Sequence, residues 1–295
     1  MRLAGPAGVV SGIAIDHRDS LRVYLEQQGL TGLTVAELRT LKRSLVRALA
    51  PASSALMLDA ELGQAAFETD AVPASIGLIM PLEAQGYETG GDARVTTLLD
   101  DFSPAIALEY GADACKLLLP YRVDDEATAA LQDALVVSTA ASCHALGLPL
   151  VIEPVVYRQS TESSSAFAGA FQGLLLRAVA RLQPLGADVL KVPFPVLDLA
   201  AAGEPAATAA CGELAEACGD TPWVLLGAGV GIDVFVDQIR LAGLAGASGF
   251  LAGRGIWGSA LSRDPAEAER LARTIALPAF ERCREMAEQF ARPLH

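Results

Sequence analysis

The sequence is poor in the residues that mark nucleic-acid-binding and metal-binding proteins. Lys and Arg number 22 against 35 Asp and Glu, and the formal net charge of −13 makes nucleic acid a poor partner. Histidine occurs three times, and neither His17 nor His144 has carboxylate or thiol neighbours at the spacing of metal ligands. We therefore expect no nucleic-acid partner and no metal site.

Paired cysteines and long apolar runs are also lacking. The five cysteines form no Cys-x-x-Cys pair, which indicates reduced thiols in a cytoplasmic protein and excludes a disulfide framework or a zinc site. No uncharged run approaches the roughly 20 residues of a membrane span, and Asp233 interrupts the best candidate at 224–236. The apolar residues 3–15 include Pro6 and lead into Asp16, so we interpret them as a buried strand and not as a signal peptide.

What the chain has in abundance is apolar sequence. Hydrophobic residues make up 52% of its 295 residues, enough for a large core. Eight short apolar runs, mostly separated by segments of helical period, have the rhythm of parallel βα units. Because they lack polar alternation, we expect them to be buried on both faces. The runs lie at residues 9–16, 55–59, 75–80, 114–119, 150–156, 189–194, 223–228 and 249–252.

The segments between these runs read as helices. Thr34 and Glu37 have the spacing of a capping box and open a helix at 35–49. Further helices are predicted at 124–146, 165–182, 204–218 and 232–242, and a long final helix or helix pair at 265–290. Eight strands with eight crossovers predict a single (β/α)8 TIM barrel domain over residues 1–295, with a doubly wound open sheet as the alternative. We interpret the Ser/Thr-rich stretch 159–165 as a mobile loop beside the active site.

Lys191 lies in the middle of the sixth run, at the end of the barrel that carries catalytic groups. Burial of an ammonium group favours its neutral amine form. A neutral amine attacks a ketone to form a Schiff base, and the protonated imine is an electron sink for cleaving a nearby carbon–carbon bond. The alternative is a lysine at a strand end whose ammonium group reaches water.

Other ionisable residues occupy similar positions. Lys116 and Glu153 lie within the fourth and fifth runs, and buried charges need partners. They are either catalytic neighbours of Lys191 or a buried ion pair. Asp16 and Asp59 close the first two runs, where each could instead cap a helix or turn, and for Asp59 we favour capping.

Small residues and an arginine follow the last two runs. Gly227, Ala228 and Gly229 close the seventh run, and Gly253 and Arg254 close the eighth. In a barrel, exposed backbone N–H groups after the seventh strand and a cation after the eighth predict a phosphate site. The alternative is that the glycines only form turns and that Arg254 pairs with a surface carboxylate.

Ordered motifs connect these positions. They are Ile-Asp-His-Arg at 15–18, Ser-Ala-Leu-Met-Leu-Asp at 54–59, Cys-Lys-Leu-Leu-Leu at 115–119, Ile-Glu-Pro-Val-Val at 152–156, Asp-Val-Leu-Lys-Val at 188–192, Trp-Val-Leu-Leu-Gly-Ala-Gly-Val at 223–230 and Gly-Ala-Ser-Gly-Phe-Leu-Ala-Gly-Arg-Gly-Ile-Trp at 246–257. In this order the chain resembles the bacterial class I tagatose-1,6-bisphosphate aldolase family, and it looks closest to the branch that holds sulfofructosephosphate aldolase. For such a protein we expect a cytoplasmic homo-oligomer with no cofactor and no membrane partner.

The resemblance implies a role for each matched residue. Lys191 matches the Schiff-base lysine, and Glu153 matches the proton shuttle that helps to form and hydrolyse the imine. Lys116 matches a lysine that orients substrate oxygens, and Asp16 the carboxylate near the hydroxyl that loses its proton during cleavage. Substrate contacts are expected from His17, Asp59, Arg122, Gly227, Ala228, Gly229, Gly253 and Arg254.

Three positions depart from the family pattern. His17 replaces the usual glutamine, Pro193 replaces an acidic residue, and Gly227 stands where serine is frequent. Arg122, in contrast, resembles the sulfosugar branch.

The implied activity is reversible cleavage of a ketose 1-phosphate to dihydroxyacetone phosphate and an aldehyde. The candidate substrates are sulfofructose 1-phosphate and tagatose or fructose 1,6-bisphosphate. One alternative is a transaldolase that uses the same imine. The other alternative is a non-catalytic regulator that binds sugar phosphate. Pro193 and Gly227, which depart from the family pattern, are the residues that favour it.

Overall fold

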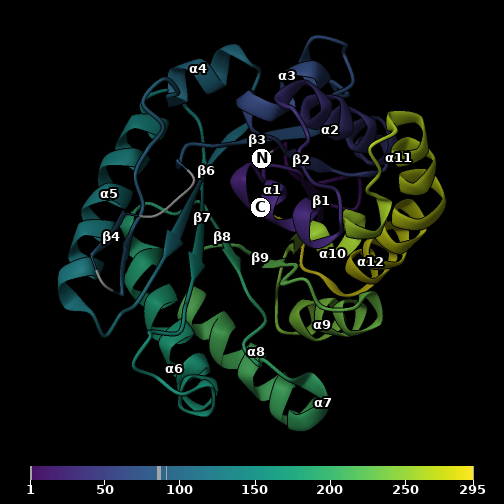
Figure 1. Cartoon of the computed structure of the whole chain (residues 1–295). Helices are drawn as coiled ribbons and strands as arrows, with labels where there is room; N and C mark the ends of the chain where they lie inside the picture. Colours follow the sequence, from purple (N-terminus) through teal and green to yellow (C-terminus); the bar gives the residue numbers. More distant parts are fainter. Residues whose placement is uncertain (1, 85–87, 91, 295) are drawn as a thin grey trace.

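Eight parallel strands close into a barrel in the computed structural model, which describes residues 2–84, 88–90 and 92–294 (Figure 1). Their spatial order is β1-β10-β9-β8-β7-β6-β3-β2. The bounds are β1 Val10–Ala14, β2 Ala55–Met57, β3 Gly77–Pro81, β6 Ala114–Pro120, β7 Leu150–Val155, β8 Val189–Val192, β9 Trp223–Leu226 and β10 Gly249–Ala252. The eight predicted strands and the (β/α)8 TIM barrel are confirmed, and closure of the sheet excludes the open alternative.

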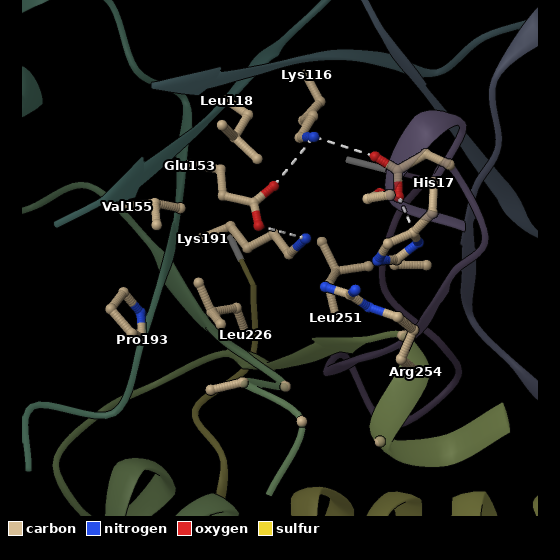
Figure 2. A pocket seen from close by; sticks show the side chains of 18 of the residues that line it. His17, Lys116, Leu118, Glu153, Val155, Lys191, Pro193, Leu226, Leu251 and Arg254 are labelled. Atoms are coloured by element: carbon tan, nitrogen blue, oxygen red, sulfur yellow. Dashed lines mark hydrogen bonds and ion pairs between the residues drawn. The ribbon is translucent and has the colours of Figure 1, made fainter. Parts of the chain in front are cut away.

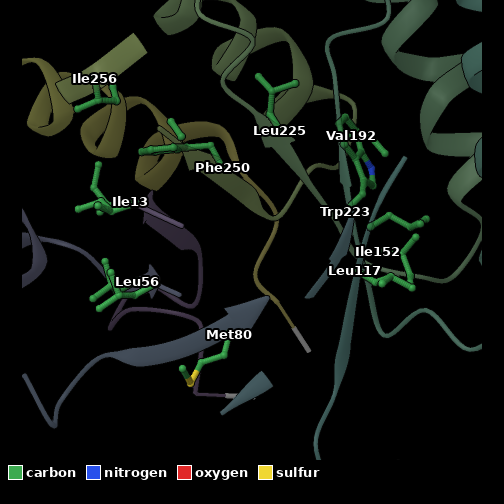
Figure 3. Close-up of a cluster of buried hydrophobic side chains, with 14 of the residues drawn as sticks. Ile13, Leu56, Met80, Leu117, Ile152, Val192, Trp223, Leu225, Phe250 and Ile256 are labelled. Carbon is green, nitrogen blue, oxygen red and sulfur yellow. The ribbon is translucent and has the colours of Figure 1, made fainter. Parts of the chain in front are cut away.

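The strands are mostly apolar because both of their faces are buried. Inward-pointing side chains such as Val10, Met57 and Val224 fill the barrel interior. Outward-pointing side chains pack against the helices in a larger cluster. Figure 3 shows part of this outer cluster, including Leu56 and Phe250. Continuous hydrophobic runs are the expected sequence of such two-sided burial.

Helices surround the barrel (Figure 1). Their bounds are α1 Asp19–Gln27, α2 Val35–Leu49, α3 Ala60–Phe67, α4 Pro104–Glu109, α5 Glu126–His144, α6 Ser164–Leu182, α7 Leu199–Ala202, α8 Glu204–Cys218, α9 Ile232–Leu244, α10 Arg254–Trp257, α11 Pro265–Leu271 and α12 Leu277–Phe290. The capping box is confirmed: the Thr34 hydroxyl accepts from the Glu37 N–H at 3.3 Å, and the Glu37 carboxylate accepts from the Thr34 N–H at 2.8 Å.

The final predicted segment forms a helix pair, as one of the two alternatives predicted. The segment 265–290 consists of α11, a π-helical turn at Ala272–Ala276, and α12. Pro278 lies in the first turn of α12 and has no N–H to donate to a carbonyl one turn earlier. The regular hydrogen-bond ladder therefore cannot run through this point, and the wider turn precedes it.

Sequence periodicity missed the shortest elements. A two-stranded antiparallel sheet, β4 Glu88–Gly90 with β5 Ala93–Val95, lies in the connection between β3 and β6. Strands of three residues are too short to show alternation. All five cysteines are buried and unpaired, which confirms the expectation of free thiols. Among the described residues, no helix combines the length and apolar character needed to cross a membrane.

Candidate active site

The carboxyl ends of the barrel strands open into a cavity of about 790 Å³ (Figure 2). Inward-pointing residues alternate along each strand, so the cavity receives every second side chain near a strand end. Lys116 projects from β6, Glu153 from β7 and Lys191 from β8. The structure therefore brings together the three ionisable side chains predicted within the strands.

Lys116 is surrounded by carboxylates. Its Nζ lies 3.0 Å from Asp16 Oδ2, 2.6 Å from Glu83 Oε1 and 3.2 Å from Glu153 Oε2. Burial alone would lower the pKa of Lys116, but the charges of Asp16, Glu153 and Glu83 raise it well above its usual value. Lys116 is therefore held as a permanent cation at the floor of the cavity.

Lys191 has a sparser environment. Its side chain is buried and its Nζ lies 2.9 Å from Glu153 Oε1. No other carboxylate in the described part of the chain lies within ion-pair distance of this nitrogen. Glu153 thus bridges the two lysines, one with each oxygen, as Figure 2 shows.

The three carboxyl groups differ in acidity. Burial alone would raise the pKa of Asp16, but Lys116, His17 and Lys191 hold it well below its usual range. Burial alone would also raise the pKa of Glu153, but Lys116 and Lys191 lower it. For Glu83 burial prevails and raises the pKa. The neighbouring cations thus lower the pKa of Asp16 and of Glu153, whereas burial raises that of Glu83.

Glu83 was missed by sequence analysis. It follows β3 by two residues, and its Oε2 also accepts a hydrogen bond from the Leu118 N–H at 3.2 Å. The sequence does contain a signal that could have identified Glu83. Every second residue from Ile79 through Pro81 to Glu83 points inward, and this alternation continues past the end of the apolar run.

His17 lines the cavity as a neutral side chain. Burial lowers its pKa to about 3, although Asp16 opposes the shift. Its ring packs edge-on against Trp257 at a centroid distance of 5.5 Å, and Trp257 Nε1 donates to the Ala14 carbonyl at 2.9 Å. Gly253 is needed beside it, because a Cβ there would lie 2.8 Å from His17 Cε1.

The expected anion-binding residues face the cavity. Gly227, Ala228, Gly229, Gly253 and Arg254 all line it. Gly229 has φ of 78°, which favours glycine. The Arg254 Cζ lies 5.6 Å from the ring centroid of Tyr24, and no described carboxylate pairs with this guanidinium. The described residues therefore do not support the alternative in which Arg254 pairs with a surface carboxylate.

Asp59 does not reach the cavity, which corrects the expectation that it contacts substrate. Met57 ends β2 and α3 begins at Ala60, so the Asp59 side chain turns to cap the helix. Its Oδ1 accepts from the Leu62 N–H at 2.7 Å, and its other oxygen pairs with the buried Lys42. The capping role favoured from the sequence is confirmed.

Arg122 also lies outside the cavity, a second correction. Its side chain is 1% exposed and its guanidinium pairs with Asp124 at 2.7 Å and with Glu162 at 2.6 Å. The guanidinium also donates to a third partner, the Tyr157 carbonyl, at 2.9 Å. The ion pair between Arg122 and Glu162 also anchors the segment 159–165. None of the residues of this segment lines the cavity, so the prediction that it forms a loop beside the active site is wrong.

Asp59→Asn should lower the free energy of unfolding by about 3–5 kcal/mol, because it leaves the buried Lys42 ammonium without its carboxylate. The double variant Lys42→Met, Asp59→Asn should recover part of the loss, because no charge is left unpaired. Urea unfolding measures both. A stable Asp59→Asn variant with a raised KM would instead indicate that Asp59 contacts the substrate.

Known proteins are similar to this chain in sequence and in fold. The DeoC/LacD family aldolase profile matches residues 10–259. Tagatose 1,6-diphosphate aldolase 2 of Streptococcus mutans serotype c is 32% identical over 283 residues, covering 90% of this chain and 85% of that protein. Tagatose 1,6-diphosphate aldolase of Lactococcus lactis subsp. lactis is 31% identical over 290 residues, covering 92% and 87%. The predicted resemblance to tagatose aldolases is confirmed.

Solved structures agree on the fold. Fructose-bisphosphate aldolase from Slackia heliotrinireducens has a TM-score of 0.64 at 19% identity, covering 96% of this chain and 86% of that one. A Schiff base-forming fructose-1,6-bisphosphate aldolase has a TM-score of 0.62 at 17% identity, covering 94% and 97%. With the family match across the whole barrel, these findings show that the chain belongs to the DeoC/LacD family of aldolases and is a carbon–carbon lyase.

Proposed function

We propose that this aldolase cleaves a ketose 1-phosphate reversibly through a Schiff base at Lys191, giving dihydroxyacetone phosphate and an aldehyde. The unequal environments of the two buried lysines carry the proposal. An amine must give up a proton before it attacks a ketone. Lys116 is held as a cation by three carboxylates, whereas Lys191 has one described carboxylate partner, so Lys191 is the nucleophile.

Glu153 is the group placed to move protons at Lys191. Its Oε1, 2.9 Å from Lys191 Nζ, accepts the ammonium proton and frees the amine to attack C2 of the ketose. The same carboxyl then returns a proton to the C2 hydroxyl of the carbinolamine, which leaves as water. The products of these steps are a protonated imine at Lys191 and a Glu153 carboxylate.

Cleavage uses the imine as the electron sink. Asp16 takes the proton of the C4 hydroxyl while the C3–C4 bond breaks, and the electron pair of that bond moves to the imine nitrogen. The aldehyde forms at C4 and an enamine remains on Lys191. Protonation of the enamine at C3 and hydrolysis of the imine release dihydroxyacetone phosphate. Lys116, 3.0 Å from Asp16 Oδ2, keeps Asp16 ionised and can orient the substrate oxygens.

Arg254→Ala should weaken binding of dihydroxyacetone phosphate by roughly 10–150-fold, because it removes a charge-assisted contact to the phosphate worth about 1.5–3 kcal/mol. The fold should survive, since Arg254 is exposed. Calorimetric titration measures the affinity. Arg273→Ala is the control, because Arg273 does not line the cavity. An unchanged affinity in Arg254→Ala would indicate that this arginine has a structural role and does not bind the phosphate.

The names of the relatives make tagatose 1,6-bisphosphate the first substrate to test. Fructose 1,6-bisphosphate and sulfofructose 1-phosphate are the others that the resemblance suggests. Release of dihydroxyacetone phosphate from a ketose 1-phosphate, without an added acceptor aldehyde, supports the proposed lyase. Release that requires an acceptor would instead indicate a transaldolase.

A further inference from the structure

We infer that Tyr24 is a positioning residue for phosphate binding, because its ring holds the Arg254 guanidinium in place without neutralising it. The inference rests on the proposed function, in which Arg254 binds the substrate phosphate, and it adds a residue of α1 to that site. Tyr24 and Arg254 both line the cavity, and the Arg254 Cζ lies 5.6 Å from the centroid of the Tyr24 ring. This separation is within the range of a cation–π interaction.

Arg254 has no anionic partner in the described part of the chain. Its side chain is exposed and reaches into the cavity beside His17 (Figure 2). Asp19 lines the same cavity, but neither it nor any other described carboxylate lies within ion-pair distance of the guanidinium. The guanidinium therefore keeps its charge and its N–H donors for a phosphate. A long side chain without a partner samples many rotamers, however, and ordering it on binding costs free energy.

An aromatic ring restricts an arginine without competing for its charge. A carboxylate partner would also restrict Arg254, but a phosphate would be repelled by that carboxylate and would have to displace it. The face of a tyrosine ring attracts a guanidinium and leaves the N–H groups at its edge free to donate. The Tyr24 ring thus lowers the cost of ordering Arg254 and preserves its contact with phosphate.

The Tyr24 ring is itself held in place. It packs edge-on against Trp257 at a centroid distance of 6.4 Å, and Trp257 Nε1 donates to the Ala14 carbonyl of β1 at 2.9 Å. Gly258 makes room for the ring, because a Cβ there would lie 3.2 Å from Tyr24 Cζ and closer still to the hydroxyl. Since Ala14 precedes Asp16 by two residues, these contacts also fix the phosphate site relative to the Asp16 carboxylate.

Tyr24→Leu tests the inference, because it keeps an apolar side chain but removes the ring. We expect the Kd for dihydroxyacetone phosphate to rise by about 3–30-fold, the scale of a cation–π contact. Calorimetric titration measures the affinity, as for Arg254→Ala. A wild-type affinity in Tyr24→Leu would overturn the inference.

Two further variants identify the part of Tyr24 that acts. Tyr24→Phe keeps the ring and removes the hydroxyl, so it should bind dihydroxyacetone phosphate as the wild type does. A loss in Tyr24→Phe as large as that in Tyr24→Leu would show that the hydroxyl acts and would overturn the role of the ring. Tyr110→Leu is the matched control, because Tyr110 is 39% exposed and does not line the cavity. An equal loss in this control would also contradict the inference.

Combining Tyr24→Leu with Arg254→Ala completes a double-mutant cycle. If Tyr24 acts through Arg254, the double variant should bind dihydroxyacetone phosphate as weakly as Arg254→Ala alone. Additive losses would show that Tyr24 acts on the ligand or the fold independently of Arg254, and would overturn the inference.

The same cycle separates the inference from the proposed function. An unchanged affinity in Arg254→Ala would contradict the phosphate site of the proposed function, and the inference with it. A loss of affinity in Arg254→Ala without a loss in Tyr24→Leu would overturn only the role of Tyr24.

Discussion

Lys191→Ala is expected to reduce the rate of dihydroxyacetone phosphate release by roughly 10⁵-fold or more, the scale on which enzymes lose activity with their covalent nucleophile. The variant cannot form the imine, so the C3–C4 bond has no electron sink. The fold should persist, because Glu153 retains Lys116 as its ion-pair partner at 3.2 Å. Steady-state assays with the best ketose phosphate and a melting curve measure both effects.

The matched control is Lys191→Arg, which keeps a positive charge beside Glu153 but provides no nucleophilic amine. It should be as inactive as Lys191→Ala. Substantial turnover in either variant would show that another group, or another mechanism, carries the reaction.

Glu153→Gln is expected to slow the reaction by about 10²–10⁴-fold, because the amide keeps the volume and hydrogen bonds of the side chain but cannot carry the proton to and from Lys191. Hydrolysis of the imine needs the same proton transfers, so the covalent adduct with the ketose phosphate should accumulate. Single-turnover rates and the amount of trapped adduct measure these two effects.

Glu83→Gln is the control for this variant. Glu83 pairs with Lys116 at 2.6 Å, as Glu153 does at 3.2 Å, but it makes no ion pair with Lys191. A purely structural role for Glu153 predicts similar changes in rate and melting temperature for both variants. A destabilised but fully active Glu153→Gln would refute the proton shuttle.

The barrel could be predicted because its physical requirement is local. Strands buried on both faces need continuous apolar sequence, and each of the eight runs meets that need within a few residues. Lys116, Glu153 and Lys191 could be predicted for the same reason, since a charge within such a run is conspicuous. Strand alternation then places all three on the inward face.

The predictions that were wrong concern residues whose partners are distant in the sequence. Asp59 turns toward Lys42, 17 residues earlier, and Arg122 turns toward Glu162, 40 residues later. Neither pairing can be read from the local sequence. Glu83 lies just past an apolar run, where only alternation carried beyond the strand end identifies it.

The central claim is that Lys191, and not Lys116, forms the Schiff base. Borohydride reduction in the presence of dihydroxyacetone phosphate, followed by peptide mass spectrometry, tests it most directly. We predict that the mass of the reduced adduct appears on the peptide that contains Lys191, and that Lys191→Ala removes it. An adduct on Lys116, or no adduct on the wild-type enzyme, would contradict the account.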